Sequence, residues 1–243
     1  MVDASTPLTI HSSPITIHMK LLLIALTFVT AAALAETAPK FRLAPSQDIQ
    51  EPGKKKVSEE AQTLAKKATV AFANGKYAEA KKDFQKVLLL APGNVPTTIN
   101  LGLIEYREKR FGEAEALLKA ATRTAPESGL PWLILGVVEF EQKKLDAALA
   151  ALAQAAFLEP KDARAHHYLG VVIGSKGWYS GAEEEMRKAI ELEPDYAEAH
   201  YNLAVFYLQR VPPAVELARR HYQKSVDLGG AVDADLEKKI EGK

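Results

Sequence analysis

Apolar and small residues recur along most of the chain with the spacing of α-helices. From residue 61 onward they return every three or four positions, as in Leu145, Ala148 and Leu152. This spacing places them on one face of a helix. Segments of about 14 residues with this pattern come in pairs, and a proline or glycine follows each pair. The pattern therefore predicts a series of helical hairpins from Ala61 to about Gly229.

The hairpins repeat every 34 residues, because several columns of residues keep that spacing. The columns are Pro92, Pro126, Pro160 and Pro194; Tyr77, Phe111, Leu145 and Tyr179; Ala80, Ala114, Ala148 and Ala182; and Leu101, Leu135, Leu169 and Leu203, followed by Gly102, Gly136, Gly170 and Ala204. Small residues let two helix axes approach to about 8–10 Å. Since one hairpin cannot bury its apolar face alone, the columns predict a stack of hairpins.

These columns resemble those of the tetratricopeptide repeat over roughly 170 of the 243 residues. The resemblance implies an all-α fold, a right-handed superhelical solenoid of about five hairpins within residues 58–230. It also implies a protein that binds other polypeptides and is not an enzyme. The expected repeats are 61–94, 95–128, 129–162, 163–196 and 197–230.

Both ends of the stack depart from the pattern. Lys67 occupies the leucine column of the first repeat, as expected for a terminal unit that meets water. In the fifth repeat Pro212-Pro213 lengthens the turn by two residues, which predicts a second helix from about 213 to 228. Within the tail 231–243, Ala234 to Ile240 is expected to form a short capping helix.

Residues 19–35 have the layout of a secretory signal peptide. Met19-Lys20 is followed by an uncharged apolar run and then by Ala33-Leu34-Ala35, which predicts cleavage after Ala35. The apolar run is shorter than the roughly 20 residues of a membrane span. The sequence therefore predicts an exported protein, periplasmic or secreted, and a retained anchor is the alternative.

The segments on either side of this leader have simpler interpretations. Residues 1–18 contain no basic residue and no periodicity, which suits a mis-assigned start codon or an extension without function. Residues 36–57 contain three prolines, Gly53 and a run of three lysines, without an apolar period. This composition is typical of a flexible linker.

Composition excludes several classes of function. The 31 basic residues balance 31 acidic ones, so no global field attracts nucleic acid. The absence of cysteine excludes disulfides, thiolate nucleophiles and cysteine-ligated zinc. No phosphate-binding glycine loop, metalloprotease motif or nucleophile elbow occurs, and we predict no cofactor.

Two histidines give the only hypothesis for site chemistry. His166 and His200 stand one repeat apart, in the column that holds Trp132. As neighbours they would suggest a metal site, although such a site needs three or four ligands. The alternative is that each is a packed, hydrogen-bonded ring. The run Glu183-Glu184-Glu185 is interpreted as a solvated helix face.

The family resemblance also implies where a partner binds. In this family the first helix of each hairpin lines a concave face along which peptides or helices lie. By register, the predicted groove consists of Ile99, Leu103, Tyr106, Arg107, Leu133, Val137, Phe140, Arg164, His167, Val171, Tyr201, Val205 and Leu208, with Leu130, Glu141, Ser175, Glu198 and Gln209 beside them. Tyr106, Phe140 and Tyr201 are expected to anchor the partner, and Arg107 and Arg164 to orient a carboxylate.

The occupant of this groove is left open by the sequence. So large an apolar surface is expected to be covered. One possible cover is a segment of another protein. A second is the chain itself, through the curvature of the superhelix, the linker or the tail. The third is a second copy of the chain. The cationic clamp with which some family members hold a C-terminal carboxylate is missing, because the matching positions are mainly Ile, Leu, Val and Phe. This disfavours the tails of cytosolic chaperones as partners.

Overall fold

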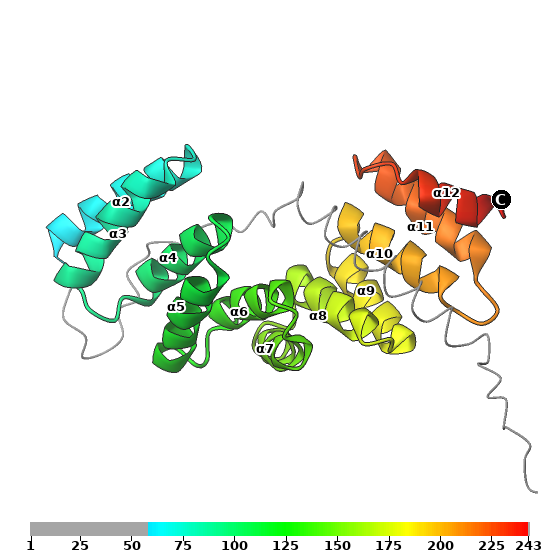
Figure 1. Ribbon diagram of the computed structural model, residues 1–243, viewed down its shortest axis with the longest axis horizontal. Coiled ribbons are helices and arrows are strands. Elements are labelled where there is room, and N and C mark those ends of the chain that lie inside the picture. Colours follow the sequence, from blue (N-terminus) through cyan, green and yellow to red (C-terminus); the bar gives the residue numbers. More distant parts are fainter. Residues whose placement is uncertain (1–57, 243) are drawn as a thin grey trace, which may run out of the picture. The chain divides into compact units, whose positions relative to one another are not determined.

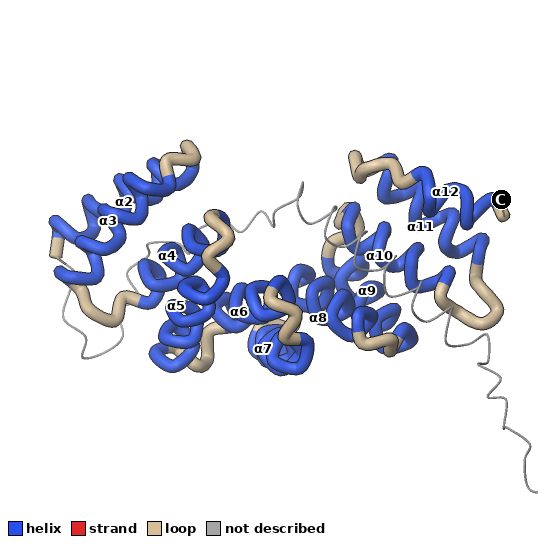
Figure 2. Tube along the Cα trace, in the orientation of Figure 1, coloured by secondary structure: helices blue, strands red, loops and turns tan. Residues whose placement is uncertain are grey.

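The computed structural model describes residues 58–242, and every regular element in that range is a helix (Figures 1 and 2). The helices are α2 (Glu59–Ala73), α3 (Tyr77–Leu90), α4 (Val95–Arg107), α5 (Phe111–Thr124), α6 (Gly129–Glu141), α7 (Leu145–Leu158), α8 (Ala163–Ser175), α9 (Tyr179–Leu192), α10 (Ala197–Leu208), α11 (Val215–Asp227) and α12 (Ala234–Glu241). The expected leader, the residues before it and the linker lie outside the described residues.

The helices pack in chain order as five hairpins, α2 with α3 through α10 with α11, followed by α12. In Figure 1 each helix lies beside the next along the chain. The first helices of neighbouring hairpins also contact one another, α4 with α6, α6 with α8 and α8 with α10. The predicted all-α repeat fold is confirmed, and the first helices α4, α6, α8 and α10 form one continuous layer.

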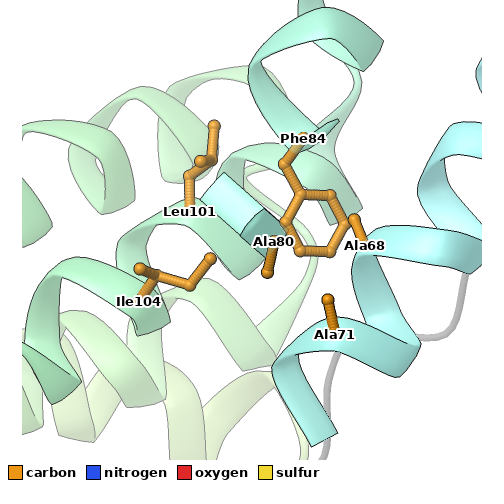
Figure 3. Close-up of a cluster of buried hydrophobic side chains, with 6 residues drawn as sticks. All are labelled: Ala68, Ala71, Ala80, Phe84, Leu101 and Ile104. Carbon is orange, nitrogen blue, oxygen red and sulfur yellow. The ribbon is translucent and has the colours of Figure 1, made fainter. Parts of the chain in front are cut away.

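Small residues in the predicted columns allow the helices to pack closely. At the N-terminal end, Ala68 and Ala71 of α2 and Ala80 of α3 are buried around the ring of Phe84 (Figure 3). Ile104 of the next hairpin belongs to the same cluster. The cluster thus joins the first hairpin to the second, as nearest-neighbour packing in a repeat protein requires.

Capping side chains define several helix starts. Ser58, Asn94 and Asp162 each accept a backbone N–H from the first turn of α2, α4 and α8, respectively. The column of prolines lies just after the second helices, as Pro92 does after α3 and its C-cap residue Ala91. Each proline therefore follows the end of a helix and does not break it.

The C-terminal end contains the longer turn and the capping helix. The helix α11 begins at Val215 and ends at Asp227, so the predicted span of 213 to 228 was too long because the turn includes Pro213 and Ala214. The tail helix α12 buries Leu236 and Ile240. Its N-cap Asp233 accepts backbone N–H groups from its first turn, which explains how eight residues form a stable helix.

Candidate functional site

The structure divides the predicted groove into buried and partly exposed side chains, all on first helices. The buried ones are Ile99, Leu103, Tyr106, Leu133, Val137, Phe140, His167 and Val171. The partly exposed ones are Arg107, Arg164, Tyr201, Val205 and Leu208. Most of the apolar side chains that were predicted to line the groove are therefore buried, and only a minority of the predicted groove residues reach solvent.

Two partly exposed members of the predicted groove already have partners within the chain. The Arg164 guanidinium forms two hydrogen bonds with the Asp162 carboxylate, from Nε to Oδ1 at 2.9 Å and from Nη2 to Oδ2 at 2.6 Å. This pairing lowers the pKa of Asp162, against the opposing effect of burial. The Tyr201 hydroxyl donates to Asp233 Oδ2 at 2.7 Å, so the tail occupies the end of this face. Their suggested roles toward a partner remain predictions.

His167 is a neutral, fully hydrogen-bonded ring in the layer of first helices. The Asn202 amide donates to its Nε2 at 2.9 Å, so the proton of the ring lies on Nδ1. That N–H donates to the Tyr196 hydroxyl at 3.1 Å. Burial lowers the pKa of His167 from 6.5 to about 3. The neutral His167 ring therefore connects α8 to α10 and the residue before it, and both of its hydrogen bonds require the neutral form.

The column of Trp132, His166 and His200 has a common structural role. Each ring donates an N–H to the backbone carbonyl of the proline six residues earlier, at 3.1, 3.1 and 3.0 Å, respectively. These carbonyls follow the ends of second helices, where no helical donor remains for them. A ring N–H in this column thus ties each first helix to the preceding loop.

The remaining ring nitrogens of these histidines have other partners. His166 Nδ1 lies 2.6 Å from Glu185 Oε2, and His200 Nδ1 lies 2.9 Å from His221 Nδ1. Within residues 58–242, no group of three or more His, Asp or Glu side chains is arranged to hold a metal ion. This geometry matches the interpretation of packed, hydrogen-bonded rings.

The expectation of a solvated face was wrong for Glu183, which is buried. Its carboxylate accepts from Arg187 Nη2 at 2.8 Å and from Arg210 Nε at 2.8 Å. Both guanidinium groups also lie against the Tyr207 ring. Arg187 is four residues from Glu183 and is visible in the sequence as a helical pair. Arg210 belongs to the next hairpin, and no sequence signal links it to this carboxylate.

A feature that the sequence analysis missed is a pair of lysines in the turns between first and second helices. One turn position requires a left-handed backbone, with φ of 73° at Gly75, 60° at Lys109, 63° at Lys143 and 82° at Gly177. A non-glycine residue there costs about 1–2 kcal/mol. Lysine near a helix C-terminus recovers only about 0.3–1 kcal/mol through the helix dipole. In the sequence, the glycines at two of these four equivalent positions were the signal that the two lysines adopt a left-handed backbone.

Replacing Lys143 with glycine is therefore expected to raise the free energy of unfolding by about 0.5–1 kcal/mol, because the turn is retained without its steric strain. Urea denaturation followed by circular dichroism measures this change. As a matched control, Gly177→Ala places a side chain at φ 82° and should lower stability. A loss of stability in Lys143→Gly would contradict the assignment of strain to this turn.

Comparisons with known proteins agree with this architecture. Family profiles described as "Tetratricopeptide repeat" match residues 71–133 and 105–170, and one described as "TPR repeat" matches residues 174–210. Together these matches span more than half of the chain. No curated protein matches it significantly. Within residues 58–242, none of the helices has the length and apolar character to cross a membrane.

Several solved structures share the fold. MamA from Desulfovibrio magneticus RS-1 is 18% identical, with a TM-score of 0.63 over 72% of this chain and 97% of that one. YrrB, described as a TPR protein with an unusual peptide-binding site, is 22% identical, with a TM-score of 0.59 over 74% and 91%. PilF of Pseudomonas aeruginosa is 19% identical, with a TM-score of 0.68 over 74% and 81%. At these identities the likeness concerns the fold alone.

Proposed function

Since this chain is a member of the tetratricopeptide repeat family, we propose that it is a protein-interaction adaptor without catalytic activity. It binds a segment of another polypeptide along the layer of first helices. One observation carries the proposal: α4, α6, α8 and α10 contact one another in order, and each carries partly exposed side chains on this layer. The peptide-binding site named for YrrB supports a similar use of the fold here.

The partly exposed side chains suggest an amphipathic partner segment. Leu130, Val205 and Leu208 offer apolar surface, whereas Glu141 and Gln209 offer polar groups beside them. A segment with apolar residues along one side and polar residues at its edges satisfies both kinds of contact.

The test uses Val205→Gln with Leu208→Gln, because truncating the buried Tyr106 and Phe140 would disturb packing as well as binding. Proteins cross-linked to the intact chain in cells are isolated and quantified. Loss of two apolar contacts on α10 is expected to reduce capture of a bound partner about tenfold or more. Undiminished capture would refute the assignment of this layer as the binding surface.

A matched control applies the same chemistry away from the layer of first helices. Leu89 and Phe157 are 82% and 79% exposed and lie on the second helices α3 and α7. The variant Leu89→Gln with Phe157→Gln should retain partner capture. Both double variants should keep the helical content of the parent chain, because the replaced side chains reach solvent.

We also propose that the adaptor works outside the cytoplasm, in a periplasm or after secretion. The signal-like segment of residues 19–35 supports this proposal. Mass spectrometry of the chain recovered from an expressing bacterium tests it. A first residue of Glu36 is expected, whereas a chain that keeps residues 19–35 in the membrane fraction would favour the anchor instead.

A second candidate function is a structural homo-oligomer. It is favoured by the outer side of α7, where Ala150, Ala153 and Phe157 are exposed. The corresponding positions of α9, Glu184, Arg187 and Glu191, are charged. Light scattering on residues 36–243 should detect a dimer that Phe157→Gln weakens. A monomer at micromolar concentration would remove this candidate.

A further inference from the structure

The side chains of the two strained lysines are not needed to form their turns. Gly75 and Gly177 occupy the same turn position in other hairpins with the same left-handed backbone. Glycine adopts this conformation without steric cost, whereas lysine does not. The turn alone therefore does not explain why Lys109 and Lys143 stand at this position.

Intramolecular ion pairs do not explain these lysines either. Within the described range 58–242, Lys109 and Lys143 form no ion pair, and both are exposed. Other cations at the turns do form one: Lys76 with Glu79, Arg110 with Glu105, Lys144 with Glu115 and Lys176 with Asp146. Neither ammonium group therefore has a carboxylate partner within residues 58–242, and that of Lys143 lies over the Phe140 ring.

The surroundings of the two lysines carry an excess of positive charge. Burial raises the pKa of the Glu141 carboxyl, and the charges of Lys143 and Lys109 both oppose that rise. This one carboxylate is influenced by the charges of both Lys109 and Lys143. The neighbouring charges balance, because Lys81 and Arg110 pair with Glu105 and Glu108. The excess favours an anionic ligand.

We propose that Lys109 and Lys143 bind two carboxylates of an acidic segment in the partner polypeptide. This inference rests on the proposed adaptor function and specifies the chemistry of its partner. Adjacent packed helices lie about 10 Å apart, and an extended chain advances about 3.3 Å per residue. The segment therefore carries Asp or Glu residues roughly three positions apart. The buried ring of Phe140 lies 5.7 Å from Lys143 Nζ and holds that ammonium group beside the layer of first helices.

The test compares three forms of the full chain against a random peptide library displayed on phage. The first is the parent chain, and the second is Lys109→Gly with Lys143→Gly, which keeps both turns. The third is Lys82→Gln with Lys161→Gln, which removes two other exposed lysines. Peptides bound by the parent should be enriched in Asp and Glu, and more salt should weaken their capture.

Loss of two exposed charge pairs is expected to reduce the capture of these acidic peptides roughly tenfold in the double glycine variant. The Lys82 and Lys161 control should retain it. Circular dichroism should show that the double glycine variant unfolds at no lower urea concentration than the parent, so a folding defect would not account for the loss.

Other outcomes separate this inference from the proposed function. Capture of peptides without acidic enrichment, or with enrichment that the double glycine variant retains, overturns the inference but leaves the adaptor function intact. Failure to capture any peptide counts against both. Binding to phosphatidylglycerol vesicles that requires both lysines, without acidic peptides being selected, would assign the pair to a membrane surface and overturn the inference.

Discussion

Replacing Gly136 with valine is expected to lower the free energy of unfolding by about 3 kcal/mol. Gly136 lies on α6, where that helix crosses α7 within the third hairpin. A Cβ atom there would lie 2.5 Å from Leu152 Cγ and 3.2 Å from the Ala148 carbonyl oxygen. Leu152 is completely buried, so its side chain has no free space into which to move. The two helices must separate, and the central hairpin loses its packing.

Urea denaturation followed by circular dichroism measures this effect. The matched control is Gly112→Ala on α5, because a Cβ atom there meets nothing within 4 Å. That change should raise stability by about 0.5–1 kcal/mol, since alanine favours the helix over glycine. Equal denaturation midpoints for the parent chain and Gly136→Val would show that the small-residue column does not set the helix separation.

The fold was predictable because the column of small residues packs against the second helix of the same hairpin, as at Gly102, Gly136 and Gly170. Gly136 must be small because it faces Leu152. In the next hairpin, Gly170 of α8 faces Met186 of α9 in the same way. Such constraints recur at every 34-residue step and appear in the sequence as identical or similar residues. A contact that every repeating unit makes requires the same kind of residue in each unit. It can therefore be recognised from the periodicity of a single sequence.

The candidate site was less predictable because it depends on contacts between hairpins. Apolar periodicity shows that Val137 and Phe140 face inward, but not that both are buried in the layer of first helices. The hydrogen bond between Tyr201 and Asp233 joins α10 to the N-cap of the tail helix. Neither residue belongs to a repeating column from which this contact could be predicted. The Arg164–Asp162 pair was also missed, although the two residues are only two positions apart and Asp162 is the N-cap of α8.

Acid is expected to destabilise the protein through His167. Burial lowers its pKa to about 3 in the folded chain, whereas the unfolded chain has an ordinary value near 6.5. Between these values the unfolded chain binds a proton that the folded chain does not. Stability from this group is complete above about pH 6.5 and falls by about 1.4 kcal/mol per pH unit as the pH decreases toward 3.

The measurement compares urea denaturation of the parent chain and His167→Gln between about pH 6 and pH 4. Glutamine can accept from Asn202 and donate to Tyr196, as the neutral ring does. Carboxylates that titrate in both proteins cancel in the difference, so the parent should lose stability relative to the variant as the pH falls. Parallel profiles would contradict the assignment of a buried neutral ring.

His166 supplies the matched control, because it is the adjacent residue on α8 and has the opposite surroundings. Its two ring nitrogens face the Glu185 carboxylate and the Pro160 carbonyl, and both are acceptors. By contrast, His167 Nε2 faces the Asn202 amide, which is a donor. His166→Gln should therefore retain the acid sensitivity that His167→Gln removes, which assigns that sensitivity to the α8–α10 contact.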